Sequence, residues 1–510
     1  MRGRKYGWLI SIVAGFIIVL MSGSIYAQPK SVLRVGWGVD AVTLDPAYQA
    51  DFRSGSVISH IMETLVVLDP KDLSVQPGLA EKWKVVDDKT YQFQLRKGVS
   101  FHDGAPFNAE AVKYSIERFI SPETKSPRAS YLNMIDQMRI VDPHTLQVSL
   151  KYPFGPFLQQ LAYFGSVIVS PKAAKEHGLK DFGNNPSGTG PFRLQDWKRG
   201  EQITLIRNDK YWGKQPGVRE IRFKVIPDEA TRVIALETGD IDLAVDVPTH
   251  EADRLMSKPG IQVITGESLR TVFLALNTRV KPLDDNRVRK AIDLAIDVEG
   301  MITALMGKYG RVPTSVMNPL IFGGKKYPPK KTDLKKAKEL LAQAGYPNGF
   351  TSKLFTPQGR YPKDKEMATL ISAQLEQIGI KAPVEVFEWA AYTSRVNNRD
   401  YSMVILGWGN TTGHADVFLH PQFHSSQMKS TLNPANYANP EVDSLLEKAR
   451  KTTNQDIQRE AYHKVLDILQ DQTPVIPLCH PMQIFALRGN VKGFVSVPTE
   501  VIVLDKVYLE

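Results

Sequence analysis

The sequence SMVILGWGNTTG occupies residues 402–413 and indicates the fold class. Its first part, 402–406, is an apolar run typical of a parallel strand that is buried on both faces. Its second part is rich in glycine, asparagine and threonine, which favour a loop. We therefore expect a buried strand that ends in a polar loop.

The segments before this strand complete an alternating pattern. Apolar residues at helical spacing occupy 367–378, and Gly379 follows as a helix end. Strands are expected on both sides of this helix, at 353–356 and 380–387, and a short helix precedes 402–406. This β-α-β-α-β order predicts a parallel sheet.

Two loops leave the carboxyl ends of these strands, at 357–360 and 408–413. In an open parallel sheet, ligands bind in the crevice beyond the carboxyl ends of the strands. If the strands are parallel, both loops lie at one edge. The prediction places the cation of Arg360, the indole of Trp408 and the hydroxyls of Thr411 and Thr412 around one crevice.

Other elements are expected in both halves of the chain. Alternating or apolar patterns predict strands at 33–37, 91–96, 145–150, 202–207 and 221–226. Asn108 and Asp333 are placed to cap two amphipathic helices.

The composition is that of a folded globular protein with a sizeable core. The chain has 510 residues, of which 42% are hydrophobic and 23% are charged, and its net charge is +10. This length predicts two or three domains. The lysines between 325 and 338 resemble a solvated loop and helix face, and no aromatic residues interleave them in the manner of a nucleic-acid site. We expect no nucleic-acid partner.

The N-terminus has the layout of a cleavable signal peptide. Arg2, Arg4 and Lys5 precede the apolar run 8–21, and Ala27 is the expected last residue removed. As a helix, this run rises only about 21 Å, less than the roughly 30 Å of a bilayer core. The mature protein is therefore expected to begin near Gln28, with residues 1–27 removed.

The chain has one cysteine, Cys479, which lies near the C-terminus in an apolar run. No cysteine follows the signal segment to accept a lipid, so we expect a protein that is free in the periplasm. A single cysteine excludes an intrachain disulfide. Nothing in the sequence pairs Cys479 with a base, and we expect a buried, inert thiol.

Three common catalytic motifs are absent from the sequence. The sequence has no Gly-x-Ser-x-Gly, no His-Glu-x-x-His and no phosphate-binding glycine loop. We expect neither an enzyme nor a bound cofactor. His414, His420 and His424 keep a metal site open as an alternative, although hydrogen-bonded or surface histidines are favoured and no metal ligand is assigned.

Seven motifs, spread over most of the mature chain, resemble those of the solute-binding proteins of ABC importers, in the peptide and nickel family (family 5). They are Thr43-Leu44-Asp45-Pro46, PGLAEKW (77–83), LRKGVSFHDG (95–104), GTGPF (188–192), NDKYW (208–212), LETGDID (236–242) and NRVRKAI (286–292).

The resemblance implies an α/β, two-lobed periplasmic binding protein fold of type II that closes by a hinge. Lobe I would comprise 28–268 with an inserted subdomain at about 75–185. Lobe II would comprise 269–481, and 482–510 would return to lobe I.

The family implies a periplasmic receptor that captures a di- or oligopeptide or a glutathione-type ligand and delivers it to the permease subunits of an ABC importer. We expect a monomer. One alternative is a nickel or metal-chelate receptor of the same family, and another, from a different class, is a secreted hydrolase.

The loop after Gly407 limits the class of ligand that the resemblance implies. Peptide binders of the family hold the ligand amine with an aspartate at the position of Thr411, and Arg360 lies near their carboxylate-binding arginine. The pattern 411–416 is more similar to the glutathione-binding subgroup, although His414 stands where an acid is expected. The predicted ligand-binding residues are Arg360, Trp408, Asn410, Thr411, Thr412, Gly413, Asp416 and Asp45.

Overall fold

The first sheet organises the N-terminal part of the chain. The computed structural model describes residues 32–49, 51–429 and 432–510, so the expected signal peptide lies outside the described residues. The seven strands of this sheet follow the order β12-β21-β11-β1-β10-β9-β8. Their bounds in that order are Ile261–Gly266, Gln483–Arg488, Leu243–Val245, Val32–Trp37, Glu220–Val225, Gln202–Arg207 and Phe192–Lys198.

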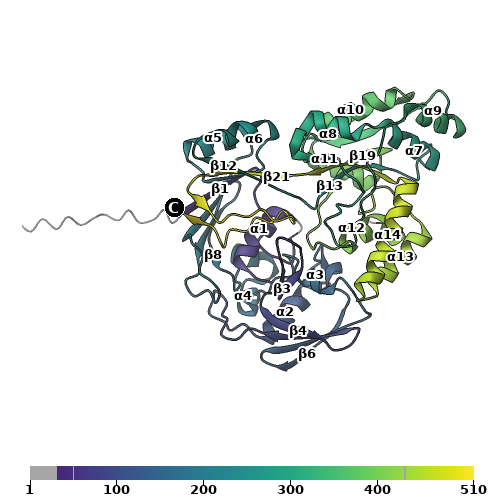
Figure 1. Ribbon diagram of the computed structural model, residues 1–510. Helices are drawn as coiled ribbons and strands as arrows, with labels where there is room; N and C mark the ends of the chain where they lie inside the picture. Colours follow the sequence, from purple (N-terminus) through teal and green to yellow (C-terminus); the bar gives the residue numbers. More distant parts are fainter. Residues whose placement is uncertain (1–31, 50, 430–431) are drawn as a thin grey trace, which may run out of the picture.

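Helices cover both faces of this sheet (Figure 1). Helix α1 (Phe52–Ile61) shares one core with β1, in which Trp37 stacks on Phe223 with ring centroids 4.5 Å apart. Helices α5 (Glu229–Thr238) and α6 (Thr249–Met256) contribute to a separate core on the other face. We call this sheet and its helices lobe I.

A second sheet, which is antiparallel throughout, forms a layer of its own at the far end of lobe I (Figure 1). Its order β4-β5-β7-β6 joins Ala80–Val85, Thr90–Leu95, Thr145–Leu150 and Ile135–Asp142. Helix α2 (Ala109–Ile120), capped by Asn108 as expected, packs against it. The short strands β2 (Val66–Leu68) and β3 (Val75–Pro77) and the helices α3 (Phe157–Leu161) and α4 (Pro171–Asp181) complete this part.

The third sheet belongs to the other half of the molecule, which we call lobe II. It has the order β14-β20-β13-β19-β16-β18, with bounds Gly310–Arg311, Val475–Pro481, Thr271–Leu276, Met403–Trp408, Leu354–Pro357 and Val384–Phe387. Strand β16 is parallel to both β18 and β19, which confirms the predicted parallel arrangement. Strand β13 is antiparallel to β19 and β20, so the sheet as a whole is mixed.

The strand predicted at 402–406 is buried on both faces as expected, because Ile405 of β19 joins one core and Val404 joins the other. In β13, Leu274 joins one core, whereas its neighbour Phe273 joins the other, because successive side chains of a strand point to opposite faces. One core contains α7 (Asn286–Ala295), α8 (Val298–Met306), α9 (Leu334–Gln343) and α10 (Asp364–Glu376). The other contains α11 (Trp389–Asn398), α12 (Asp416–Phe423), α13 (Pro440–Arg450) and α14 (Gln455–Gln472).

One expected strand is divided in two. Residues 380–387 form β17 (Ile380–Lys381) and β18 rather than a single strand. Strand β17 pairs with β15 (Phe350–Thr351) in a separate sheet. Pro383 lies between the two pieces, and a proline has no N–H to continue a ladder.

The chain crosses between the lobes at two points. Residues 267–270 connect β12 of lobe I to β13 of lobe II, and Met482 connects β20 back to β21. The C-terminal segment then packs on lobe I, where Ile502 and Leu504 join its core and β23 (Tyr508–Leu509) pairs with β22 (Val491–Lys492). Within the described ranges, no helix has the length and apolar character needed to cross a bilayer.

Candidate functional site

The two predicted loops lie at the same edge of the lobe II sheet. They follow β16 and β19, which are parallel neighbours. The hydroxyl of Tyr361, the residue after Arg360, donates a hydrogen bond of 3.3 Å to the carbonyl of Gly407, at the end of β19. This edge therefore holds both of the sequence-predicted segments.

Asn410 gives the loop 409–413 its shape. This buried residue donates from its amide to the carbonyl of His414 at 2.9 Å, and its oxygen accepts from the N–H of Thr412 at 3.2 Å. The indole N–H of Trp408 donates to the carbonyl of Val417 at 3.0 Å, which ties the loop to α12. Asn410 and Trp408 thus have polar atoms that are engaged inside the protein.

The hydroxyls of Thr411 and Thr412 differ from these groups. Both oxygens are buried, and neither forms a hydrogen bond with a described group. A buried polar atom without a partner costs roughly 1–3 kcal/mol. Unpartnered hydroxyls in a loop at the edge of a sheet are therefore candidates to contact a ligand.

Arg360 lies at the other loop, with an exposed side chain. Its guanidinium is 4.8 Å from the ring centroid of Trp389 and 5.9 Å from that of Tyr361. Its backbone N–H donates to Asp364 at 2.9 Å, and the same carboxylate accepts from Gly359 and Tyr361. The loop is fixed by Asp364, whereas no carboxylate within the described ranges forms an ion pair with the Arg360 side chain.

The loop 409–413 also meets lobe I. A Cβ atom built on Gly409 would lie 2.7 Å from the ring of Phe52 in α1 and 3.2 Å from the guanidinium of Arg270. Gly413 has a φ of +66°, and a Cβ there would lie 3.0 Å from Leu73 of lobe I. Both glycines are therefore required by the close approach of the two lobes.

Arg270 lies at one of the two chain crossings. Its guanidinium forms an ion pair with Glu500, with a distance of 3.0 Å from Nε to Oε1, and stands 5.1 Å from the ring centroid of Phe52. Burial raises the pKa of Glu500, but Arg270 and Ser268 more than offset this, and the net pKa lies below its usual range. Arg270 and Glu500 are contacts that the sequence analysis did not identify, because 230 residues separate them.

A second contact between the lobes lies beside α12 and α13. The N–H of Gly155 in lobe I donates to the carbonyl of Arg450 in lobe II at 3.1 Å. A Cβ on Gly155 would lie 2.3 Å from the carbonyl oxygen of Thr452. The guanidinium of Arg450 is 5.4 Å from the ring centroid of Phe154, and Gln160 of α3 reaches Asp416 at 3.5 Å.

Asp416 and Asp45, both predicted ligand contacts, have carboxylates that form ion pairs with arginines. Asp416 accepts from Arg450 at 3.0 Å and 3.2 Å. Burial raises its pKa, but the charge of Arg450 dominates and the net pKa is lowered. Asp45 accepts two hydrogen bonds from Arg118, at 2.8 Å and 2.5 Å. These ion pairs indicate that both aspartates stabilise the fold.

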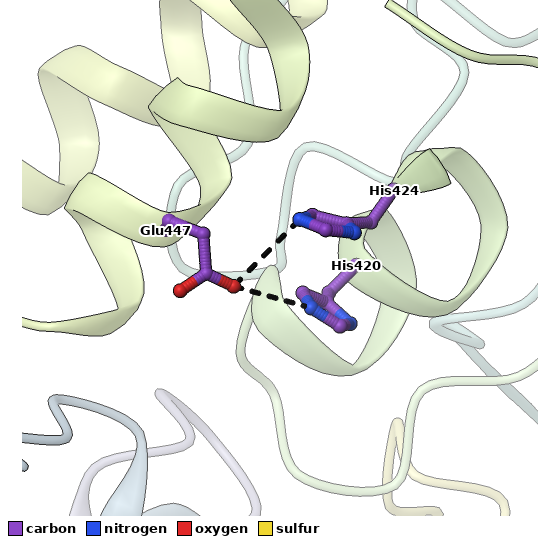
Figure 2. Close-up of side chains that lie close together, drawn as sticks. All are labelled: His420, His424 and Glu447. Atoms are coloured by element: carbon purple, nitrogen blue, oxygen red, sulfur yellow. Dashed lines mark ion pairs between the residues drawn. The ribbon is translucent and has the colours of Figure 1, made fainter. Parts of the chain in front are cut away.

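Two of the three histidines singled out in the sequence come together with an acid (Figure 2). Nε2 of His420 and Nε2 of His424 lie 3.6 Å and 3.7 Å from the same oxygen of Glu447 in α13. However, Arg450 approaches Nε2 of His420 at 2.8 Å. Burial, and then the charge of Arg450, lower the pKa of His420 to about 4. The nitrogen that a metal would need accepts from a guanidinium, which disfavours a cation there.

His414 lies apart from that cluster. Its ring stacks on Phe322 with centroids 5.0 Å apart, and its Nδ1 accepts from the N–H of Asp416 at 3.2 Å. Burial lowers its pKa to about 4. His414 is thus a neutral core residue. Cys479 is equally inert, because burial raises the pKa of its thiol to about 12.

Comparisons with known proteins agree with this architecture. Residues 74–430 match the family described as Bacterial extracellular solute-binding proteins, family 5 Middle. The chain is 32% identical over 489 residues to the glutathione-binding protein GsiB of Salmonella choleraesuis (strain SC-B67), covering 94% of this chain and 95% of that protein.

Solved structures extend the comparison to three dimensions. The periplasmic binding protein DppA of Helicobacter pylori, in complex with the peptide STSA, superposes with a TM-score of 0.83 at 31% identity, covering 94% of this chain and 98% of that one. A dipeptide-binding protein of Pseudoalteromonas sp. SM9913, in complex with Met-Leu, gives 0.84 at 25% identity, covering 94% and 100%. The fold is that of a periplasmic binding protein, and the chain belongs to the family 5 bacterial extracellular solute-binding proteins.

Proposed function

We propose that this protein is the periplasmic receptor of an ABC importer and that it binds glutathione, or another peptide with a γ-glutamyl head, between its two lobes. The observation that carries the proposal is the pair of buried, unpartnered hydroxyls on Thr411 and Thr412. The similarity to GsiB over nearly the whole chain supports the same ligand class.

The chemistry of the head group favours this ligand over a simple dipeptide. An ordinary peptide presents a bare ammonium, which requires an anion when it is buried. A γ-glutamyl head carries an amine and a carboxylate on one carbon. Hydroxyls can donate to one of these groups and accept from the other. An aspartate at 411 would attract the amine but repel the neighbouring carboxylate.

Within this proposal, Arg360 binds a ligand carboxylate, and Trp408 covers the apolar part of the ligand. Asn410 and Gly413 shape the loop. Asp416 and Asp45 act indirectly, because their carboxylates are held by Arg450 and Arg118.

Closure of the lobes about the two chain crossings completes the site. We place the lobes at 28–268 and 269–481, with an inserted subdomain at about 75–185 and a return at 482–510. The sheet memberships of β20 and β21 support the boundary near 482. The Gly155 contact supports a closed state, because it joins the lobes away from the ligand loop.

Titration calorimetry tests the ligand. Glutathione and γ-Glu-Cys should bind, whereas a plain Ala-Ala series should bind weakly or not at all. Thr411→Asp should weaken the γ-glutamyl ligands and leave dipeptide binding equal or better. Tight Ala-Ala binding with no heat from either γ-glutamyl ligand contradicts the proposal.

Closure is tested by small-angle scattering with and without glutathione. The radius of gyration should fall on binding. Gly155→Ala should reduce both this compaction and the affinity, since its Cβ would meet the backbone of Thr452 in the closed state. An unchanged radius with saturating ligand contradicts closure.

The remaining parts of the proposal concern location and partners. The mature chain is proposed to begin near Gln28, without a lipid anchor, as a monomer that docks on permease subunits. N-terminal sequencing of protein taken from the periplasm checks the first point. A full-length chain in the membrane fraction contradicts it.

A further inference from the structure

Arg128 is a cation on lobe I that the function above does not use. It precedes the short helix η1 (Ala129–Tyr131), between α2 and β6, and its side chain is half-buried. Its guanidinium lies 5.8 Å from the ring centroid of Tyr131. Burial lowers the pKa of Arg128, but the nearby tyrosines 131 and 163 raise it above its ordinary value. The guanidinium is therefore held between aromatic side chains as a full charge.

The partners of Arg128 differ from those of six other arginines that are buried or half-buried, of which Arg232 and Arg289 donate to backbone carbonyl oxygens. The other four form ion pairs with an acid, namely Arg34 with Asp242, Arg118 with Asp45, Arg270 with Glu500 and Arg450 with Asp416. Across 32–49, 51–429 and 432–510, no carboxylate forms an ion pair with Arg128. Burying an uncompensated charge is costly, so such a guanidinium is suited to an anion that arrives with a ligand.

A continuous series of rings connects Arg128 to the ligand loop. Tyr131 packs on Tyr163 and Tyr163 on Phe164, with centroids 4.8 Å and 4.5 Å apart. Phe164 then lies 6.0 Å from Phe52, the ring that meets Gly409 of the loop. Each of these rings belongs to lobe I. The series therefore runs along the wall of lobe I from Arg128 to the point where the two lobes meet.

Polar contacts place the same wall at the lobe interface. The hydroxyl of Tyr163 donates to Gln49 at 2.9 Å, close to the start of α1. Gln160, in the helix just before Tyr163, reaches Asp416 of lobe II at 3.5 Å. Arg128 therefore belongs to the surface of lobe I that closes on lobe II.

We propose that Arg128 binds a second carboxylate of the ligand, so that the receptor selects peptides with two carboxylates, one for Arg128 and one for Arg360. This inference rests on the proposed function and narrows its ligand class. Glutathione carries two such groups, one on the γ-glutamyl head and one on the terminal glycine. A guanidinium suits this task because its planar fork matches the two oxygens of a carboxylate.

Calorimetry with two matched ligand pairs tests the assignment. The first pair is glutathione and its glycine amide, which lacks one carboxylate. The second is Ala-Ala-Glu and Ala-Ala-Gln, which differ by one carboxylate without any γ-glutamyl group. In the unmodified protein, whichever pair binds, the ligand with two carboxylates should bind more tightly than its amide counterpart. Arg128→Ala should lower the affinity for that dicarboxylate by roughly 30-fold or more. In at least one pair, this variant should no longer bind the dicarboxylate more tightly than the amide.

Controls separate binding from folding. Arg128→Lys keeps the charge without the fork and should recover part of the affinity. Arg139→Ala removes an exposed arginine of the following strand β6, whose side chain contacts Gln147, and should leave affinity unchanged. Thermal unfolding of every ligand-free variant checks the fold, and Arg128→Gln replaces the alanine variant if that one is unstable.

The outcomes distinguish this inference from the proposed function. If glutathione binds and Arg128→Ala changes its affinity less than threefold, the second carboxylate site is overturned while the receptor proposal stands. An equal loss for dicarboxylates and amides also overturns it. If glutathione fails to bind but Ala-Ala-Glu shows a preference that depends on Arg128, the ligand proposal fails and the Arg128 site stands. If none of the four ligands binds the unmodified protein, both are overturned.

Discussion

The loop 409–413 and helix α12 are neighbours in sequence, yet the threonines of the loop and the ionisable residues of the helix differ in their hydrogen-bond partners. In α12, Asp416 and His420 both contact Arg450, and Glu447 approaches His420 from α13. In the loop, the hydroxyls of Thr411 and Thr412 are buried without a partner. The comparison shows that residue type alone does not identify a binding site. Asp416 and His420, which have charged and metal-binding side chains, are bonded to Arg450. The buried hydroxyls of the two threonines, like the amide of Gln422 in α12, form no hydrogen bond to a described group.

The largest expected effect comes from removing the ion pair between Asp416 and Arg450. Asp416→Ala leaves Arg450 buried without its acid, and the free energy of unfolding should fall by about 3–5 kcal/mol. Urea denaturation of the ligand-free protein measures this. Glu460→Ala, which removes an exposed pair with Lys464, is the control and should change stability by less than about 0.5 kcal/mol. A loss below about 1 kcal/mol for Asp416→Ala would mean that the ion pair does not organise α12 and α13.

Arg360→Ala should give the opposite profile, with affinity lost and stability kept. Removing one partner of a buried charge pair costs about 2–5 kcal/mol, which is roughly 30-fold to several thousand-fold in the affinity for glutathione. Since the Arg360 side chain is exposed and forms no ion pair with a described carboxylate, the free energy of unfolding should be unaffected. Arg395→Ala is the matched control, because Arg395 also lies over a ring, that of Phe387, but pairs with Asp400. A change in affinity of less than threefold for Arg360→Ala assigns this arginine to the surface.

The pH dependence of the free energy of unfolding tests the lowered pKa values of the buried histidines. Burial, with Arg450 also acting on His420, lowers the pKa of His414, His420 and His480 to about 4 in the folded protein, against about 6.5 when unfolded. The unfolded chain then binds more protons between these values. The stabilisation is complete above pH 6.5 and is lost as the pH falls towards 4, by up to about 1.4 kcal/mol per pH unit for each histidine.

Denaturation at pH 7, 6 and 5 measures this slope. His414→Gln should flatten it, whereas His250→Gln, at an exposed position, should not. A slope that is unchanged by His414→Gln would show that His414 titrates normally in the folded protein.

The smallest expected effect tests whether a buried threonine hydroxyl contacts the ligand or stabilises the fold. Thr412→Val removes an unpartnered hydroxyl, so the free protein should keep or gain stability, while glutathione affinity falls by about 1 kcal/mol, roughly fivefold. Thr189→Val is the matched control, because its hydroxyl donates to Glu63 at 2.7 Å and its loss should lower stability. If Thr412→Val is destabilising and leaves affinity intact, the hydroxyl has a structural role.

Local patterns predicted the parallel part of lobe II because its strands and helices follow one another within about sixty residues and each carries its own periodicity. The antiparallel additions, β13 and β20, come from segments far away in the chain, which no local pattern connects. The division of 380–387 followed from Pro383, a signal that was present in the sequence.

The site was predicted to a similar extent. The positions of the loop and of Arg360 followed from the topology, because parallel strands bring their carboxyl ends to one edge. The engagement of Asp45 and Asp416 did not, since Arg118 lies 73 residues from Asp45 and Arg450 lies 34 residues from Asp416. Arg128 carries no motif at all, and its surroundings, tyrosine rings without an ion-paired acid, arise only in three dimensions.

The position of β21 has a consequence for the order in which the molecule can form. This strand comes from residues 483–488, yet it lies between β11 and β12, whose first residues, 243 and 261, are made 240 and 222 residues earlier. The ribosome must therefore synthesise nearly the whole polypeptide before the first sheet can close. Until then β11 and β12 have no partner between them, and the early half of a nascent chain stays incomplete while the later half is still being added.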